Sequence, residues 1–160
     1  MAARRGASAA SRVFLAFLGA VVVITVLLVV LLALQAQATE RGEAEAVTLA
    51  VARTIAEMPE VAAAVTSGSD ADATAQLQPV AERIMEETPI DFVTIMTTDG
   101  IRLTHRDPAE IGRPYLGTIA PALEGQTLTE EAVGTLGPSL RSVVPVTSDG
   151  EVVALSLIHI

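Results

Sequence analysis

Residues 90–104, IDFVTIMTTDGIRLT, decide the fold of this chain. In residues 90–97 apolar and polar side chains alternate and β-branched residues are frequent, which indicates a half-buried strand. Asp99-Gly100 is a hairpin-turn signal, so residues 101–104 are predicted to return as a second strand. Before Pro89 the apolar positions recur at helical spacing instead, so the change of period marks the start of an antiparallel sheet.

The flanking sequence predicts an α+β domain in which the helices come first and the sheet follows. Amphipathic helices are predicted at residues 39–58 and 72–87, with a short piece at 59–65 between them and Asp70 or Asp72 as the cap of the second helix. Three more strands are predicted at residues 128–133, 139–146 and 152–157, and a short helix at 119–124. We therefore expect a five-stranded antiparallel sheet with the long N-terminal helix packed on its back.

A membrane-spanning helix is predicted ahead of this domain. Residues 13–34 carry no charge, and as a helix they are about 33 Å long, enough for a bilayer core of about 30 Å. Arginines precede the span and acids follow it, so we expect residues 1–12 in the cytoplasm and an extracytoplasmic domain at 35–160. The alternative is a signal peptide cleaved near Ala36-Gln37-Ala38, although signal cores are usually shorter than this run.

The composition excludes several classes of function. The chain has no cysteine, no tryptophan and one tyrosine, and its net charge is −9, so nucleic-acid binding is not expected. No catalytic motif is present: there is no Cys nucleophile, H-E-x-x-H or G-x-S-x-G, and no metal or cofactor site is predicted. An enzyme in this fragment is therefore unsupported, although an exported anchored enzyme stays as an alternative.

Basic residues gather in two stretches of this acidic chain. Residues 101–115 contain Arg102, His105, Arg106 and Arg113, and residues 134–145 contain Arg141. Guanidinium groups bind carboxylates bidentately, so two of them suit a di- or tricarboxylate. The alternative for an arginine among acids is a surface ion pair, which we expect for Arg106 and Arg113. From the residues alone His105 could also serve only to cap its loop.

Two motifs give a family resemblance. R-L-x-H-x-x-P-x-x-I-G-x-P-Y from residue 102 and G-x-L-G-P-S-L-R-x-x-x-P-V from residue 134 follow a membrane span, a long helix and a D-G hairpin. This order resembles the extracytoplasmic PAS-like (single-Cache) sensor domain of citrate/C4-dicarboxylate sensor histidine kinases, of which the chain is an N-terminal fragment. The resemblance implies five ligand-binding residues: Arg102, His105, Arg141, Thr135 and, on the preceding strand, Thr94.

The sequence also departs from that family. A lysine often follows the arginine of the second motif, whereas here Ser142 and Val143 stand there. The last strand usually ends in a V-S-V-G-like run, whereas this chain ends in residues 155–160, LSLIHI. We expect the final five or so residues to reflect a truncation or an artefact, and we assign no role to His159.

The function expected from the resemblance is the ligand-sensing input of a two-component receptor in the cell membrane. It implies a small carboxylate ligand and a response regulator reached through a kinase region beyond this fragment. A homodimer through the helix at 39–58 is expected because this amphipathic helix continues from the anchor and is more apolar than one sheet contact needs. A structural ectodomain that dimerises without ligand is the other alternative. Because Arg102 and His105 are three residues apart, one straight strand places them on opposite faces, so the chain is expected to bend after Thr104. The three cations are then expected to meet on the sheet face away from the long helix, where their mutual repulsion needs an anion, with residues 107–117 closing over it.

Overall fold

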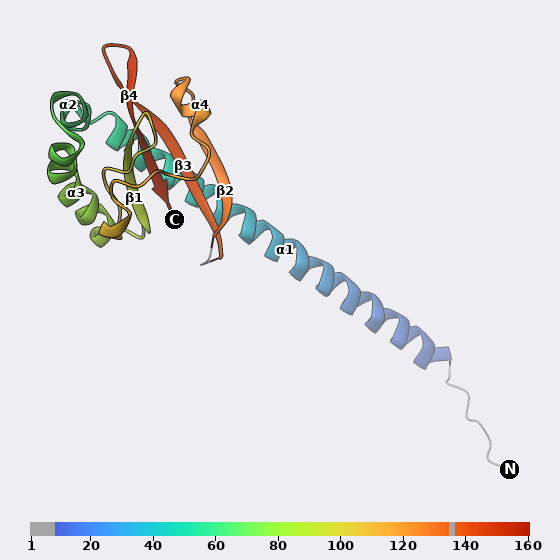
Figure 1. Ribbon diagram of the computed structural model, residues 1–160. Helices are drawn as coiled ribbons and strands as arrows, with labels where there is room; N and C mark the ends of the chain where they lie inside the picture. The colour runs from blue at the N-terminus through green and yellow to red at the C-terminus, as the bar shows by residue number, and fades with distance from the viewer. Residues whose placement is uncertain (1–8, 135–136) are drawn as a thin grey trace. The chain divides into compact units, whose positions relative to one another are not determined.

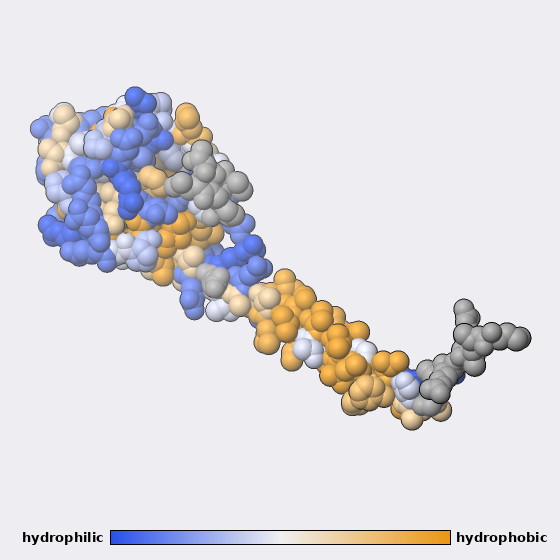
Figure 2. Space-filling model, turned by 90° about the horizontal axis from the view of Figure 1, so that it is seen from below, coloured by the Kyte–Doolittle hydropathy of each residue, from blue (hydrophilic) through white to orange (hydrophobic). Residues whose placement is uncertain are grey.

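The computed structural model describes residues 9–134 and 137–160, and the chain divides into two compact units, Met1–Arg41 and Gly42–Ile160. Helix α1 (Ala9–Ala56) begins in the first unit and ends in the second. Its N-terminal part is long and apolar enough to cross a membrane. Figure 2 shows this part as an almost unbroken hydrophobic surface, whereas the second unit displays mostly hydrophilic residues with smaller hydrophobic patches.

Three helical segments of the second unit precede its sheet (Figure 1): the end of α1, α2 (Pro59–Ser67) and α3 (Asp70–Glu87). Pro59 starts α2 because its ring fixes a helical φ and the first helical N–H has no partner in any case. The N-cap of α3 is Ser69, so our expectation of Asp70 or Asp72 was wrong by position. Ser69 and Asp72 form a capping box in which each side chain accepts from the other residue's main-chain N–H.

The sheet has four antiparallel strands in the order β1-β4-β3-β2. They are β1 (Phe92–Thr97), β2 (Leu128–Gly134), β3 (Gly137–Ser148) and β4 (Glu151–His159). A two-residue turn joins β3 to β4, and its residues Asp149 and Gly150 both have positive φ, 53° and 85°. Such a turn twists in the same sense as the strands it joins, which is why D-G is favoured there. The 3₁₀ turn η1 (Pro108–Glu110) and helix α4 (Ala120–Leu123) lie between β1 and β2.

The predicted strand at residues 101–104 is the exception, so the expected five strands become four. This segment makes only two isolated bridges, Met96 to Arg102 and Ile101 to Pro114. Main-chain bonds from Leu103 and Thr104 both reach the carbonyl of Ile95, at 2.8 and 3.2 Å, but the N–H of Ile95 is satisfied by a side chain. Thr104 Oγ1 accepts from that N–H at 2.8 Å and donates to the carbonyl of Val93 at 3.1 Å. The segment therefore borders β1 without continuing the sheet.

The two faces of the sheet carry two separate hydrophobic clusters. Helices α1, α2 and α3 pack on one face, in a cluster that includes Ile55, Leu77 and the sheet residue Val144. The other face, called here the site face, is lined by buried Met96, Val143, Leu155 and Leu157, with Ala122 of α4 against them. The fold is thus α+β, with the end of the long N-terminal helix packed on one face of an antiparallel sheet, as predicted.

The end of the chain is part of the sheet. Residues 151–159 form the strand β4, which lies between β1 and β3. Leu157 and Ile158 are buried, one on each face, and Ile160 exchanges main-chain hydrogen bonds with Leu140 at 3.0 Å. Whatever their origin, residues 156–160 supply core contacts in this structure.

Candidate functional site

Strand alternation places two of the expected ligand-binding residues on the site face. Thr94 pairs with Leu157 across β1 and β4, and Arg141 lies two residues before Val143 on β3. Because alternate strand residues share a face, both side chains are on the side of Leu157 and Val143, opposite α1, α2 and α3. Thr94 is 1% exposed. The predicted Thr135 lies outside the described residues.

Arg102 and Arg141 meet at one aromatic ring. The guanidinium carbon of Arg102 is 5.6 Å from the ring centroid of Tyr115, and that of Arg141 is 5.7 Å from the same centroid. Both distances fit cation–π contacts. Tyr115 packs against the cluster of the site face, and its hydroxyl is buried without a hydrogen-bond partner among the described residues. A Cβ on Gly117 would collide with that hydroxyl, so glycine permits the close approach.

Sequence reasoning did not include Tyr115 in the site. It is the last residue of the first motif and the only tyrosine in the chain, and that position was a signal that it belongs to the site. Burial raises the pKa of its phenol, while Arg141 and Arg102 act in the opposite direction and Glu130 adds to the increase. The phenol therefore stays neutral and can donate a hydrogen bond at physiological pH.

Arg102 is held by the loop that follows it. Its side chain is 13% exposed, and Nη1 donates to Glu110 Oε2 at 3.0 Å and to the carbonyl of Pro114 at 3.1 Å. The other oxygen of Glu110 accepts from Arg113 at 3.2 Å, so one carboxylate bridges two guanidinium groups. Arg113 thus forms the surface ion pair predicted for it, whereas Arg106 donates to the carbonyl of Ile90.

Arg141 is paired with a carboxylate of the neighbouring strand. Its Nε donates to Glu130 Oε1 at 2.7 Å and its Nη2 lies 2.5 Å from the same oxygen. The two residues are register partners across β3 and β2, and their side chains are 22% and 27% exposed. Together with Glu110, Glu130 offsets the charge of the arginines. Our expectation of a cluster of mutually repelling cations was therefore wrong, because Glu110 and Glu130 pair with the two arginines.

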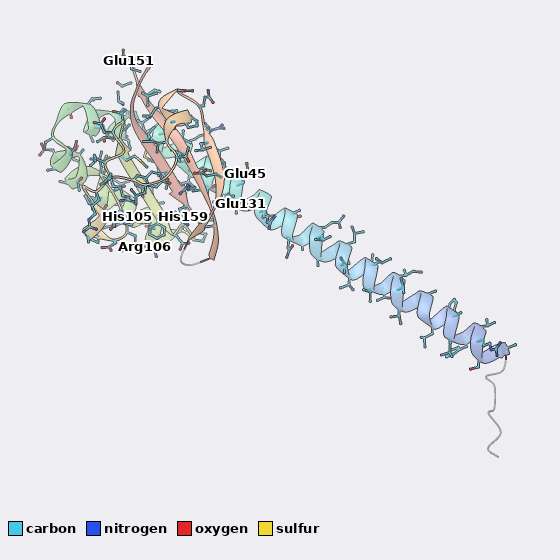
Figure 3. The ribbon with its side chains drawn as sticks, turned by 45° about the vertical axis from the view of Figure 1, so that its right-hand side comes forward. Glu45, His105, Arg106, Glu131, Glu151 and His159 are labelled. Carbon is cyan, nitrogen blue, oxygen red and sulfur yellow. The ribbon has the colours of Figure 1, made fainter. Side chains whose placement is uncertain are left out.

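His105 lies at the end of the same face. Its ring stacks on Phe92 of β1 at a centroid distance of 5.1 Å. Phe92 and Arg141 both pair in register with His159 of β4, so His105, Phe92, His159 and Arg141 follow one row across the sheet. Figure 3 shows His105 and His159 near each other at one end of the sheet and Glu151 at the other. Burial lowers the pKa of His159, against the attraction of Asp91, and Arg141 lowers it further.

The main chain at His105 is fixed by α3. The side chain of Gln78 donates to the carbonyl of His105 at 2.8 Å and accepts from its N–H at 3.0 Å. Ring atom Nδ1 lies 3.1 Å from the main-chain nitrogen of Asp107, which leaves Nε2 for another partner. The chain leaves β1 here because the buried Thr104 is bonded to the strand and His105 to the helix.

A separate pocket of about 530 Å³ lies between the α1–α2 turn and β3, and its described lining does not include Thr94, Arg102, His105 or Arg141. Its lining includes Arg53, Met58, Pro59, Val144 and Pro145. We place the candidate site at the arginines and not at this pocket, because the paired cations around a buried phenol provide specific anion chemistry. Among the described lining residues, Arg53 is the one cation and Glu57 the one carboxylate.

Comparisons with known proteins show the family of the chain. The family model described as single cache domain 3 matches residues 33–160. The sensor protein CitS of Halalkalibacterium halodurans is 34% identical over 110 residues, covering 67% of this chain and 20% of the relative. The sensor histidine kinase DcuS of Escherichia coli K12 is 28% identical over 114 residues, 68% of this chain and 20% of the relative. The chain thus spans about a fifth of the length of these relatives.

Solved structures give the same fold. The E. coli DcuS sensor domain superposes with a TM-score of 0.66 at 24% identity, covering 75% of this chain and 90% of that one. The sensor domain of the V. cholerae histidine kinase DctB gives a TM-score of 0.64 at 15% identity, covering 82% of this chain and 56% of that one. With the family model matching most of the chain, the protein belongs to the single cache domain 3 family, and its domain is of the extracytoplasmic PAS-like type of the citrate and C4-dicarboxylate sensor kinases.

Proposed function

We propose that this chain is the ligand-sensing input end of a membrane-anchored two-component sensor histidine kinase and that it binds a small di- or tricarboxylate. The observation that carries the proposal is the pair of arginines around Tyr115 on the site face. Guanidinium forks recognise carboxylates, and two of them near one phenol suit a ligand with two carboxylates. The names of the relatives CitS and DcuS as sensor proteins support this assignment.

In this proposal each site residue makes a different contact with the ligand. Arg102 and Arg141, which pair with Glu110 and Glu130, each bind one carboxylate of the ligand. His105 adds a donor through Nε2, because its Nδ1 faces the main chain of Asp107. Thr94 and, from the second motif, Thr135 offer hydroxyl groups, and the phenol of Tyr115 offers another. Residues 107–117 carry Glu110, so a ligand that releases Glu110 also frees this loop to rearrange around it.

A route for the signal begins next to Arg141. The following residue, Ser142, points to the opposite face, where its hydroxyl lies 3.0 Å from that of Thr48 on α1 and 3.0 Å from that of Thr129 on β2. A shift of β3 on ligand binding therefore reaches α1 through a buried hydrogen bond. Ligand then favours one of two arrangements of β3 and α1 by its differential affinity for them.

The proposed setting is the cell membrane, with residues 1–12 cytoplasmic and the sensor domain outside. We propose a homodimer through residues 39–58, supported by the exposed Val47, which is 41% accessible on α1. The cognate response regulator is reached through a kinase region outside this chain. The relatives named as sensor histidine kinases support this architecture.

The proposal is tested by calorimetric titration of the anchored chain with succinate, malate, fumarate and citrate. Arg141→Ala is expected to weaken the best ligand by about 2–5 kcal/mol, because a desolvated charge pair is truncated. Arg141→Lys is expected to recover only part of the loss, since a point charge does not replace the fork. The matched control is Arg83→Ala on α3, which removes the same charge from an exposed helical position.

The result that contradicts the proposal is equally specific. If Arg102→Ala and Arg141→Ala bind every responsive acid as tightly as the unaltered chain, the arginines do not form the site. If the unaltered chain binds none of the four acids, the assignment of a di- or tricarboxylate ligand is wrong.

A further inference from the structure

The carboxylate of Glu130 is bound to the guanidinium of Arg141. Nε and Nη2 of Arg141 both contact the same oxygen, Oε1 of Glu130, at 2.7 and 2.5 Å. About three quarters of each side chain is covered, so the pair lies in a partly desolvated position where charge interactions are stronger than at the open surface. The main chain of Glu130 is also fixed, because Glu130 is the register partner of Arg141 in the β2–β3 ladder.

Glu130 cannot move far from a ligand that binds Arg141. The main chain of β2 holds its Cα opposite that of Arg141, so only rotation of the side chain can release the ion pair. An incoming carboxylate on Arg141 then has the carboxylate of Glu130 as a neighbour. Two carboxylates held next to the same guanidinium repel each other unless a hydrogen-bond donor lies between them.

We infer that Glu130 is a specificity-determining residue, which makes the site prefer carboxylates that carry a hydroxyl or ammonium group on the carbon next to the carboxylate. Such a donor can bond to the carboxylate of Glu130 while the ligand carboxylate binds Arg141. An unsubstituted acid lacks the donor and leaves the two carboxylates to repel each other. This inference rests on the proposed carboxylate-sensing function and names the ligand class within it.

Other charged residues around Arg141 do not supply the same contact. Glu110 is engaged with Arg102 and Arg113. The neighbouring Glu131 faces the other side of β2, by strand alternation. Among the residues that the structure describes, Glu130 is therefore the carboxylate paired with Arg141 that a ligand there meets first.

The test compares succinate with L-malate, which differs by one hydroxyl group next to a carboxylate. Calorimetric titration of the anchored chain is expected to give about tenfold tighter binding of malate, the size of one charge-assisted hydrogen bond. In Glu130→Gln the ratio of malate affinity to succinate affinity is expected to fall about fivefold. The neutral amide accepts a weaker hydrogen bond from malate and no longer repels succinate. Most of the fall should come from tighter succinate binding. Glu131→Gln, with the same change of charge one residue away, is expected to keep the original ratio.

The outcomes separate this inference from the function on which it rests. If neither acid nor citrate binds the unaltered chain or either variant, the carboxylate-sensing function is overturned and the inference with it. If the acids bind through Arg141 but Glu130→Gln leaves the malate-to-succinate ratio unchanged, the inference alone is overturned. Equal changes in Glu130→Gln and Glu131→Gln also overturn it, because the effect is then one of net charge.

Discussion

At the scale of single residues, the site is organised by Tyr115 and by the charges around it. The phenol is covered by the cluster of the site face, and its ring contacts both arginines. Glycine at position 117 leaves the space that the hydroxyl occupies. Because the chain has one tyrosine and no tryptophan, the ultraviolet absorbance and fluorescence of the protein report on this residue directly.

The phenol of Tyr115 is expected to titrate above its ordinary pKa of 10.0, because burial disfavours the phenolate more than the arginines favour it. Because the folded-state pKa lies above the unfolded value, the contribution of the neutral phenol to the free energy of unfolding is complete below pH 10.0. This contribution is lost as pH rises through the folded-state pKa. Absorbance titration of tyrosinate in the folded and urea-unfolded protein measures both values. A folded pKa at or below the unfolded one would show that the ring is solvated or that the arginines dominate.

At the scale of elements, α3 and the loop after Thr104 are joined by Gln78. Its amide group makes the same pair of hydrogen bonds to His105 that a neighbouring strand would make. It stands immediately before Pro79, within the helix. The position of the His105 ring over Phe92 therefore depends on a residue of a helix that packs on the opposite face of the sheet.

Gln78→Ala is expected to lower carboxylate affinity about tenfold, because His105 then loses its fixed main chain and with it one hydrogen bond in the bound state. Titration calorimetry measures this loss, and in His105→Ala the same substitution should have little further effect. The control is Gln76→Ala on the same helix, whose amide donates to the carbonyl of Asp72 in its own helix. Additive losses in the double variant would mean that Gln78 does not act through His105.

A second contact between elements joins α1 to the sheet through hydroxyl groups. Thr48→Val keeps the shape of the side chain but removes the bond to Ser142, and both residues are fully buried. We expect a loss of about 1 kcal/mol in the free energy of unfolding. Thr54→Val, exposed on the same helix and bonded to its own turn, should change stability by less than about 0.5 kcal/mol. Chemical denaturation compares the two, and equal losses would contradict a role for the buried contact.

At the scale of the whole molecule, the chain combines an apolar helical span with a compact domain from Gly42 on. The arginines at the N-terminus and the acids that follow the span favour a cytoplasmic N-terminus. The absence of cysteine makes this orientation easy to measure, because any introduced thiol is unique.

Ser67→Cys, at the exposed end of α2, is expected to react with a membrane-impermeant maleimide on intact cells whose outer layers admit the reagent. Ala10→Cys is expected to react only after the membrane is permeabilised, because positive charges hold the N-terminus in the cytoplasm. Labelling of Ala10→Cys in intact cells, with Ser67→Cys protected, would reverse the assigned orientation.

The sequence by itself determined the features that depend on local pattern. The alternation in residues 90–97 placed β1, and the Asp149-Gly150 turn placed the β3–β4 hairpin, because period and turn chemistry act over a few residues. The prediction of a strand at 101–104 was wrong. The hydroxyl of Thr104 bonds to main-chain groups of β1, and the local pattern does not indicate that a side chain will do so. The two long motifs gave the family, and their arginines lie around one ring.

Only the tertiary structure decided which groups these residues meet. Glu110 and Glu130 are two of many acids in the sequence, and nothing near them in the chain indicates that they neutralise Arg102 and Arg141. Ser142 and Thr48 are 94 positions apart and meet only because β3 packs on α1. Such partners are chosen by burial and by the pairing of strands, which depend on the whole chain, so the charge balance of the site and its link to the helix could not be read from sequence.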